Sequence, residues 1–165
     1  MSAKQPKETD VIKELLGAYG KLQKRIDNTE ERLAFLEETS GSPSTPNLSG
    51  MPAGSRDRTS KQERDTIRKL ELEEKLRDMY AEENQKREEI EEMIEQMEKP
   101  DEQTVIEMHY IDNANWRAIS AALHGSEPDY DEHEKRYLKK TFKIHGSALQ
   151  TLLRIYNAER EKVAL

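Results

Sequence analysis

Residues 135–158 read KRYLKKTFKIHGSALQTLLRIYNA, a stretch with six basic side chains and no acidic one. It belongs to a chain of 165 residues that is 37% charged. The stretch carries a charge of +6, which leaves −13 on the remainder of a chain whose net charge is −7. Solvated helix faces usually mix the two signs. Positive charge confined to one helix-length window of an acidic protein therefore indicates a surface that receives a polyanion.

A helix through this stretch has two different faces. At about 100° per residue, the cations and amides fall on one side and an apolar stripe falls on the other. The apolar stripe consists of Leu138, Phe142, His145, Leu149, Leu152 and Tyr156. The candidate DNA-contacting residues are Arg136, Lys139, Lys140, Lys143, Ser147, Gln150 and Arg154. For this window taken alone, a solvated basic face without a nucleic-acid role is an equally direct interpretation.

The composition excludes several classes of protein. Hydrophobic residues make up 33% and aromatic residues 5% of the chain, which is typical of long helices with narrow apolar seams. There is no cysteine, so disulfides and thiolate chemistry are excluded. No apolar run approaches the roughly 18 residues that a membrane span needs, and a cytoplasmic protein is expected. The histidines lack metal-ligand spacing and no catalytic motif is present, so we expect no enzyme, no cofactor and no metal.

Residues 1–99 are expected to form a coiled-coil hairpin. Apolar residues spaced three and four apart predict two long helices, at about 9–38 and 61–98. Between them, 15 of the 22 residues from Thr39 to Ser60 are Ser, Thr, Gly or Pro, which predicts a flexible loop over 39–60. The two helices can pair with each other or with a second protomer.

Residues 100–165 predict a helix-turn-helix domain. Pro100 ends the coil, a short helix follows over about 101–111, and Asn115 is a suitable N-cap for a second short helix over 116–123. Gly125 ends this helix, and the long basic helix runs from about 131 to 161. The core residues expected between these helices are Ile106, Tyr110, Trp116, Ile119 and Leu123. The expected fold class is therefore all-α, although a three-helix bundle with no nucleic-acid role would share this apolar pattern.

Several stretches resemble a known family. Glu102–Ile111 and Asn115–Gly125 resemble the promoter-reading, region-4-like C-terminal part of sigma-70-type factors. Thr141–Leu149 resembles the end of the recognition helix in phage proteins of that type. Asn47–Ser55 looks like the loop between two coiled-coil helices in those same small proteins. As a group they are similar to the RinA/ArpU-type activators of late genes in phages of Gram-positive bacteria.

The resemblance implies sequence-directed DNA binding and contact with host RNA polymerase. It places Lys140, Lys143 and Ser147 at base-reading positions and makes Arg136 and Arg154 phosphate contacts. One departure concerns the segment Ser126–Glu134, which inserts five carboxylates ahead of the basic helix. Carboxylates at that end would repel phosphate. Either the insert folds away, or the body of the helix reads DNA and its N-terminus does not.

We therefore expect a non-enzymatic, DNA-binding transcription regulator that acts with host RNA polymerase on phage promoters in the bacterial cytoplasm. It is not expected to be a complete sigma factor, because residues 1–100 lack a basic, aromatic-rich domain for melted DNA. The expected partners are double-stranded DNA, host RNA polymerase and a further copy of the chain through the coiled coil, with no membrane and no small-molecule substrate. Two alternatives are a DNA-packaging adaptor similar to a small terminase subunit, and a polymerase-binding protein that makes no DNA contact.

Overall fold

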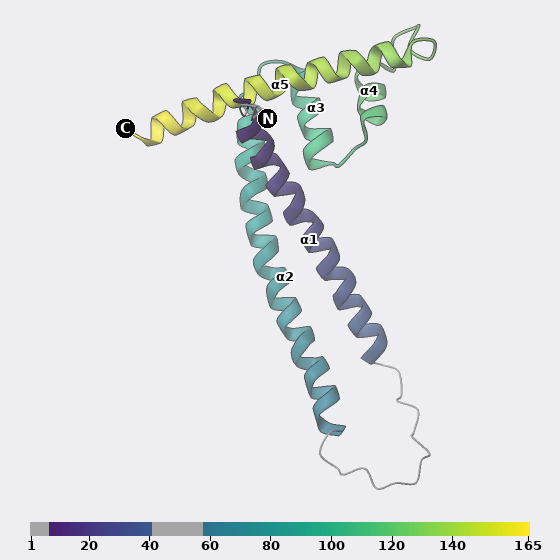
Figure 1. Ribbon diagram of the computed structural model, residues 1–165, viewed down its shortest axis with the longest axis vertical. Coiled ribbons are helices and arrows are strands. Elements are labelled where there is room, and N and C mark those ends of the chain that lie inside the picture. Colours follow the sequence, from purple (N-terminus) through teal and green to yellow (C-terminus); the bar gives the residue numbers. More distant parts are fainter. Residues whose placement is uncertain (1–6, 41–57) are drawn as a thin grey trace, which may run out of the picture. The chain divides into compact units, whose positions relative to one another are not determined.

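The computed structural model describes residues 7–40 and 58–165, and every regular element in these two ranges is a helix. The elements, shown in Figure 1, are α1 (Asp10–Ser40), α2 (Arg58–Glu95), α3 (Pro100–Ile106), the π-helical turn η1 (Glu107–Ile111), α4 (Trp116–His124) and α5 (Glu134–Val163). The all-α class is confirmed. Most of the loop expected over 39–60, including the stretch Asn47–Ser55, lies outside the described residues.

The chain divides into two compact units. One comprises Met1–Lys21 together with Gln85–Leu165, and the other is Leu22–Asn84. This division differs from the boundary expected between residues 99 and 100. The difference arises because the beginning of α1 and the end of α2 share their apolar contacts with the C-terminal helices.

The unit Leu22–Asn84 is a pair of antiparallel helical segments. Its buried cluster consists of Leu22, Ile26, Leu76 and Met79, with the partly buried Leu33 packed against it, and Leu72 is buried as well. The polar position that interrupts the seam of α1 is Thr29, which is 6% exposed and donates its hydroxyl to the Arg25 carbonyl at 2.7 Å. The seam thus joins two helices of one chain, which is the intramolecular form of the expected hairpin.

The larger unit has a core to which four helices contribute. The beginning of α1 supplies Ile12, Leu16 and Tyr19, each no more than 1% exposed. The remaining buried members come from the end of α2 and the connection that follows it, from α3 and from α5: Ile90, Met93, Ile94, Met97, Ile106, Ala148, Leu149, Leu152 and Leu153. Cutting the chain between Lys99 and Pro100 would therefore separate residues that share one core.

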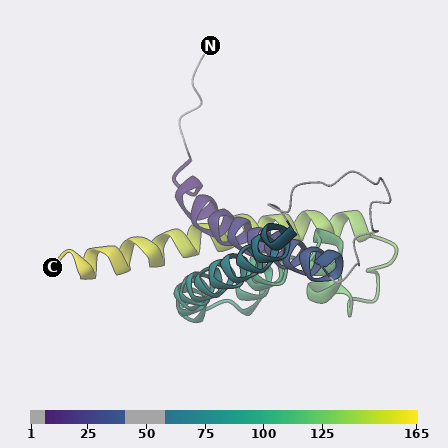
Figure 2. The same ribbon diagram turned by 90° about the horizontal axis from the view of Figure 1, so that it is seen from below.

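Local signals set the positions of the short helices. Figures 1 and 2 show α3 and α4 on one side of the N-terminal half of α5. Pro100 occupies the first turn of α3, and the Asn115 side chain accepts the Ala118 N–H at 2.9 Å as the expected N-cap of α4. Gly125 ends α4 where a Cβ atom would lie 2.4 Å from the Ala121 carbonyl oxygen, so this position cannot hold a side chain without movement.

The buried face of α5 differs in part from the expected stripe. Its buried residues are Tyr137, Thr141, Ala148, Leu149, Leu152 and Leu153. Leu149 and Leu152 belong to both sets, but Phe142 is 44% exposed and was wrongly expected to be buried. The small side chains of Thr141 and Ala148, both 0% exposed, let neighbouring elements approach α5 closely. Neighbouring elements can therefore approach α5 most closely at these small residues, and Phe142 lies beside them.

Replacing Leu16 by Ala should lower the free energy of unfolding of the larger unit by about 2–5 kcal/mol, because the side chain is fully buried in the shared core. The measurement is urea unfolding followed by the fluorescence of Trp116, which lies in the same unit. Val11→Ala is the control: Val11 is 46% exposed, and its loss should change the free energy by no more than about 0.5 kcal/mol. An unshifted Trp116 transition in Leu16→Ala would show that α1 is not part of this core.

Candidate nucleic-acid interface

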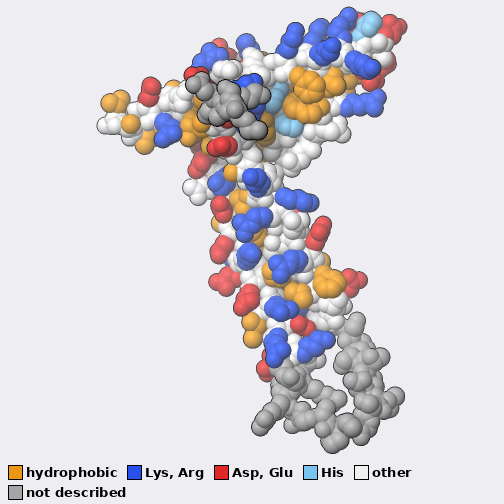
Figure 3. Space-filling view, in the orientation of Figure 1, with side chains coloured by type: hydrophobic (Ala, Val, Ile, Leu, Met, Phe, Trp, Pro, Cys, Tyr) orange, Lys and Arg blue, Asp and Glu red, His pale blue; other side chains and the backbone are white. Residues whose placement is uncertain are grey.

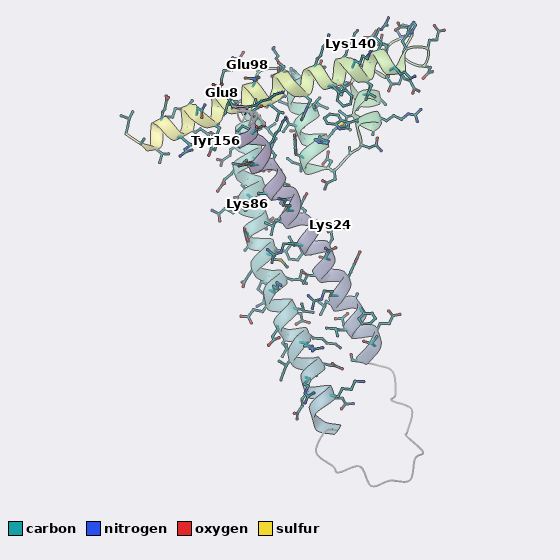
Figure 4. All side chains as sticks on the ribbon, in the orientation of Figure 1. Glu8, Lys24, Lys86, Glu98, Lys140 and Tyr156 are labelled. Carbon is teal, nitrogen blue, oxygen red and sulfur yellow. The ribbon has the colours of Figure 1, made fainter. Side chains whose placement is uncertain are left out.

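All seven residues expected to contact DNA are exposed residues of α5: Arg136, Lys139, Lys140, Lys143, Ser147, Gln150 and Arg154. They lie on the side of the helix away from its buried residues, but Ser147 on this side also contacts Glu102 of α3. Figure 3 shows Lys and Arg side chains gathered along the N-terminal half of α5. Figure 4 labels Lys140 on this part of the helix. We call this surface the basic face of α5.

The cations of the basic face differ in how they are held. Lys139, Lys143 and Arg154 have no ion pair or ring partner in the described part of the chain. The Lys140 ammonium lies 4.8 Å from the centroid of the Tyr137 ring, a cation–π contact that keeps its charge exposed. Arg136 instead forms an ion pair with Asp129. Four cations of the face are therefore available to a phosphate without breaking a salt bridge.

The acidic insert folds against the first turns of α5. Asp129 accepts a hydrogen bond from the Tyr137 hydroxyl at 2.5 Å and pairs with Arg136 through its other oxygen. Glu134 pairs with Arg117 of α4 at 3.1 Å. The hydrogen bond from Tyr137 and the neighbouring Arg136 guanidinium hold the pKa of Asp129 below its usual range. Two of the five carboxylates of the insert are thus matched by cations.

The other three carboxylates of the insert, Glu127, Asp131 and Glu132, are exposed close to the N-terminal end of α5. They are unfavourable neighbours for a phosphate backbone. The middle of α5, from Lys139 onward, is therefore better suited to a polyanion than its first turn.

A buried carboxylate joins α3 to α5, and sequence reasoning missed it. Glu102 is 3% exposed and accepts the Ser147 hydroxyl at 2.5 Å and the Thr151 hydroxyl at 2.9 Å. The Lys99 ammonium lies 3.6 Å from the same carboxylate. Burial opposes ionisation of Glu102, but the two hydroxyl donors and Lys99 outweigh it and lower its pKa.

The contact with Glu102 changes the part that Ser147 plays. Ser147 was placed at a base-reading position, and here its hydroxyl already holds α3 against α5. The spacing of Ser147 and Thr151 on α5 predicts this contact only when α3 is already known to lie beside α5.

An aromatic and histidine cluster fills the space between η1, α4 and α5. Trp116 stacks on His109 with ring centroids 4.2 Å apart and meets Phe142 edge-on at 5.0 Å. The Tyr110 hydroxyl and the Nε2 atom of His145 are hydrogen-bonded at 2.9 Å. Burial, with added repulsion from His109 and Lys13, lowers the pKa of His145 to about 4. His145 is therefore neutral at pH 7 and acts as a packed core side chain.

The described residues offer neither a metal site nor a membrane-spanning helix. Among residues 7–40 and 58–165, no group of three or more His, Cys, Asp or Glu side chains is arranged to hold a metal ion. No helix of the described residues is long and apolar enough to cross a membrane.

Comparison with known proteins places this chain in a family. The model of DUF722, described as a protein of unknown function, matches residues 8–145. Because the match runs from the start of α1 into the middle of α5, the protein belongs to the DUF722 family. No curated protein and no solved structure matches the chain.

Glu102→Ala should lower the free energy of unfolding by about 1–3 kcal/mol, because it removes a buried acceptor and leaves two hydroxyl groups without it. Asp101→Ala is a matched control in the same helical turn, since Asp101 is exposed, and it should change the free energy by less than about 1 kcal/mol. Urea unfolding of both variants tests the expectation. Equal losses would mean that the hydroxyl contacts of Glu102 add nothing to the docking of α3.

The depressed pKa of His145 makes stability sensitive to acid. Its value of about 4 in the folded protein lies below the ordinary value of 6.5, so the unfolded chain binds the proton more tightly. The contribution of His145 is fully present above pH 6.5 and is lost as the pH falls toward 4. Between pH 7 and pH 5, the free energy of unfolding should fall less in His145→Gln than in the unmodified protein or in the exposed-site control His133→Gln. The same loss in all three proteins would exclude His145 as its source.

Proposed function

We propose that this protein is a sequence-directed, double-stranded-DNA-binding transcription regulator that contacts DNA through the basic face of α5. One observation carries the proposal. Lys139, Lys140, Lys143 and Arg154 are exposed on the side of α5 opposite its buried residues, in a helix with no acidic residue between Glu134 and Glu159. In an acidic protein, this is where a polyanion meets the least repulsion.

The dimensions of α5 suit the major groove of DNA, which admits one α-helix. Lys140 and Lys143 are about one turn apart. Arg154 lies about 20 Å from Lys140 along the helix axis, at a rise of about 1.5 Å per residue. Cations with this spacing can reach phosphates on both sides of a groove. The short helices α3 and α4 pack against α5, as the supporting helices of a helix-turn-helix domain do, and α3 contacts it at Ser147 and Thr151 beside the cations.

Base reading in this proposal falls to the middle of α5. Gln150 is exposed on the basic face and has no hydrogen-bond partner in the described part of the chain. A glutamine amide can form two hydrogen bonds with adenine. Lys143 is the second candidate, because a lysine can donate to guanine. Ser147 contributes indirectly, since its hydroxyl is engaged by Glu102.

The resemblance of Glu102–Ile111 and Asn115–Gly125 to sigma-70-type factors supports the rest of the proposal. In it, the protein is a phage-encoded regulator similar to the RinA/ArpU-type activators. It acts with host RNA polymerase in the bacterial cytoplasm, and the coiled coil provides self-association.

The test is a DNA-binding titration of Lys140→Glu combined with Lys143→Glu. Fragments for the titration come from selection of bound sequences out of random duplex DNA by the unmodified protein. The double variant should lose binding. Affinity of the unmodified protein should fall with salt, with a log–log slope of about −0.9 for each phosphate contacted.

The matched control is Lys21→Glu combined with Lys24→Glu, which changes two exposed lysines at the same spacing on α1. It alters the net charge equally and should retain binding. If both double variants bind alike, or if affinity is indifferent to salt, the basic face does not bind DNA. If the selection enriches no DNA sequence and the protein assembles into rings of many copies, the packaging-adaptor alternative is favoured.

A further inference from the structure

The hairpin unit Leu22–Asn84 carries an open groove near the end of α1 and the beginning of α2. A cavity of about 550 Å³ lies there, lined by Phe35 and Leu36 of α1 and by Leu72 of α2 among others. Figure 1 shows the two ribbons diverging at this end. The buried cluster of the unit ends before the groove, because its last member on α1 is Ile26, with Leu33 packed against it. Of the apolar side chains that line the groove, Leu72 is buried and Leu36 is partly buried, whereas Phe35 is left open to solvent.

Large apolar side chains are exposed on the stretches of α1 and α2 that carry the groove. Phe35 is 63%, Ile67 is 54% and Leu70 is 60% exposed. Of these three, only Phe35 lines the groove; Ile67 and Leu70 are on the same stretch of α2 but are not among its lining residues. A largely exposed phenylalanine beside the partly buried Leu36 gives the groove an apolar surface that a partner can cover.

The charges of the groove have one dominant sign. Arg32, Arg68 and Lys75 line it, against the single carboxylate Glu71. None of these three cations forms an ion pair with another described residue. The chain as a whole has a net charge of −7, so this excess of cations is a local feature. A ligand for the groove needs apolar side chains on one face and carboxylates beside them.

We propose that this groove binds an acidic amphipathic helix of another protein. In the helix-in-groove mode, apolar residues at positions i, i+3 or i+4, and i+7 enter an apolar groove. Here they would pack on Phe35, Leu36 and Leu72. The flanking carboxylates of the ligand would pair with Arg32, Arg68 and Lys75. Such complementary charges set partner choice and association rate.

A second copy of this chain fits the groove less well. In a twofold interface the same patch meets itself. Two grooves facing each other would bring together two sets of three cations, and like charges across an interface are unfavourable. The inference does not rest on DNA binding, because the groove and the basic face of α5 have no residue in common.

The experiment selects ligands for the full-length protein from a displayed library of helical peptides. Each peptide has leucine fixed at the i, i+3 or i+4, and i+7 positions, and acidic, basic or neutral residues vary elsewhere. We expect enrichment of peptides rich in Asp and Glu. The best peptide is then synthesised with a fluorescent label and titrated by anisotropy.

Two variants of the groove test its role. Arg32→Glu combined with Arg68→Glu should weaken peptide binding about tenfold or more, and Phe35→Ala should also weaken it severalfold. The matched controls are Lys24→Glu combined with Arg77→Glu, and Tyr80→Ala. These change exposed residues on the same two helices outside the groove, and they should bind the peptide as the unmodified protein does. Circular dichroism checks that the helix content of each variant is unchanged.

Several outcomes would overturn the proposal. No enrichment, enrichment of basic peptides, or equal binding by groove and control variants would show that the groove is not such a site. A dimer in sedimentation that Phe35→Ala abolishes would identify a second copy as the occupant. If duplex DNA displaces the peptide equally from the unmodified protein and from the Lys140→Glu, Lys143→Glu variant, that result would identify the groove as a polyanion site.

Discussion

The larger unit depends on one buried cluster that α5 shares with the beginning of α1, the end of α2 and α3. Ala148, Leu149 and Leu152 are no more than 3% exposed and belong to the same cluster as Ile12 and Leu16. Burying the apolar side of α5 leaves most of its opposite side open to solvent, except where Ser147 contacts Glu102 of α3. The basic face is thus a direct consequence of how the core is made.

Polar contacts also hold two neighbouring segments, α3 and the acidic insert, against α5. Glu102 ties α3 to α5 through two hydroxyl groups, and Asp129 ties the insert to Arg136 and Tyr137. Each contact places a carboxylate beside a helix that has no acidic residue in its own central part. Each of these carboxylates is paired with a cation, Glu102 with Lys99 and Asp129 with Arg136, so they subtract little from the positive potential of the exposed side.

Sequence patterns predicted the elements well where the signal is local. The N-cap at Asn115, the helix start at Pro100 and the heptad spacing of α1 depend on neighbours within a few residues. The buried side of α5 was only partly predictable, because Thr141 and Ala148 become central only when α3 and α4 press against them. Glu102 gave no signal either, since its partners are 45 and 49 residues away. The sharing of one core by α1 and α5 likewise depends on long-range contacts that no periodicity encodes.

The discontinuity of the larger unit has a consequence for the order of folding. Its first segment ends at Lys21 and its second begins at Gln85, so the hairpin unit is inserted between two pieces of one core. Contacts that close long loops form late, because the entropy of closure must be overcome first. During synthesis the hairpin can form as soon as α2 is made, and Ile12, Leu16 and Tyr19 then have only the end of α2 and α3 to pack against until α5 completes their core. Until α5 is made, the nascent chain exposes part of an apolar surface, and such surfaces are recognised by chaperones in unfinished proteins.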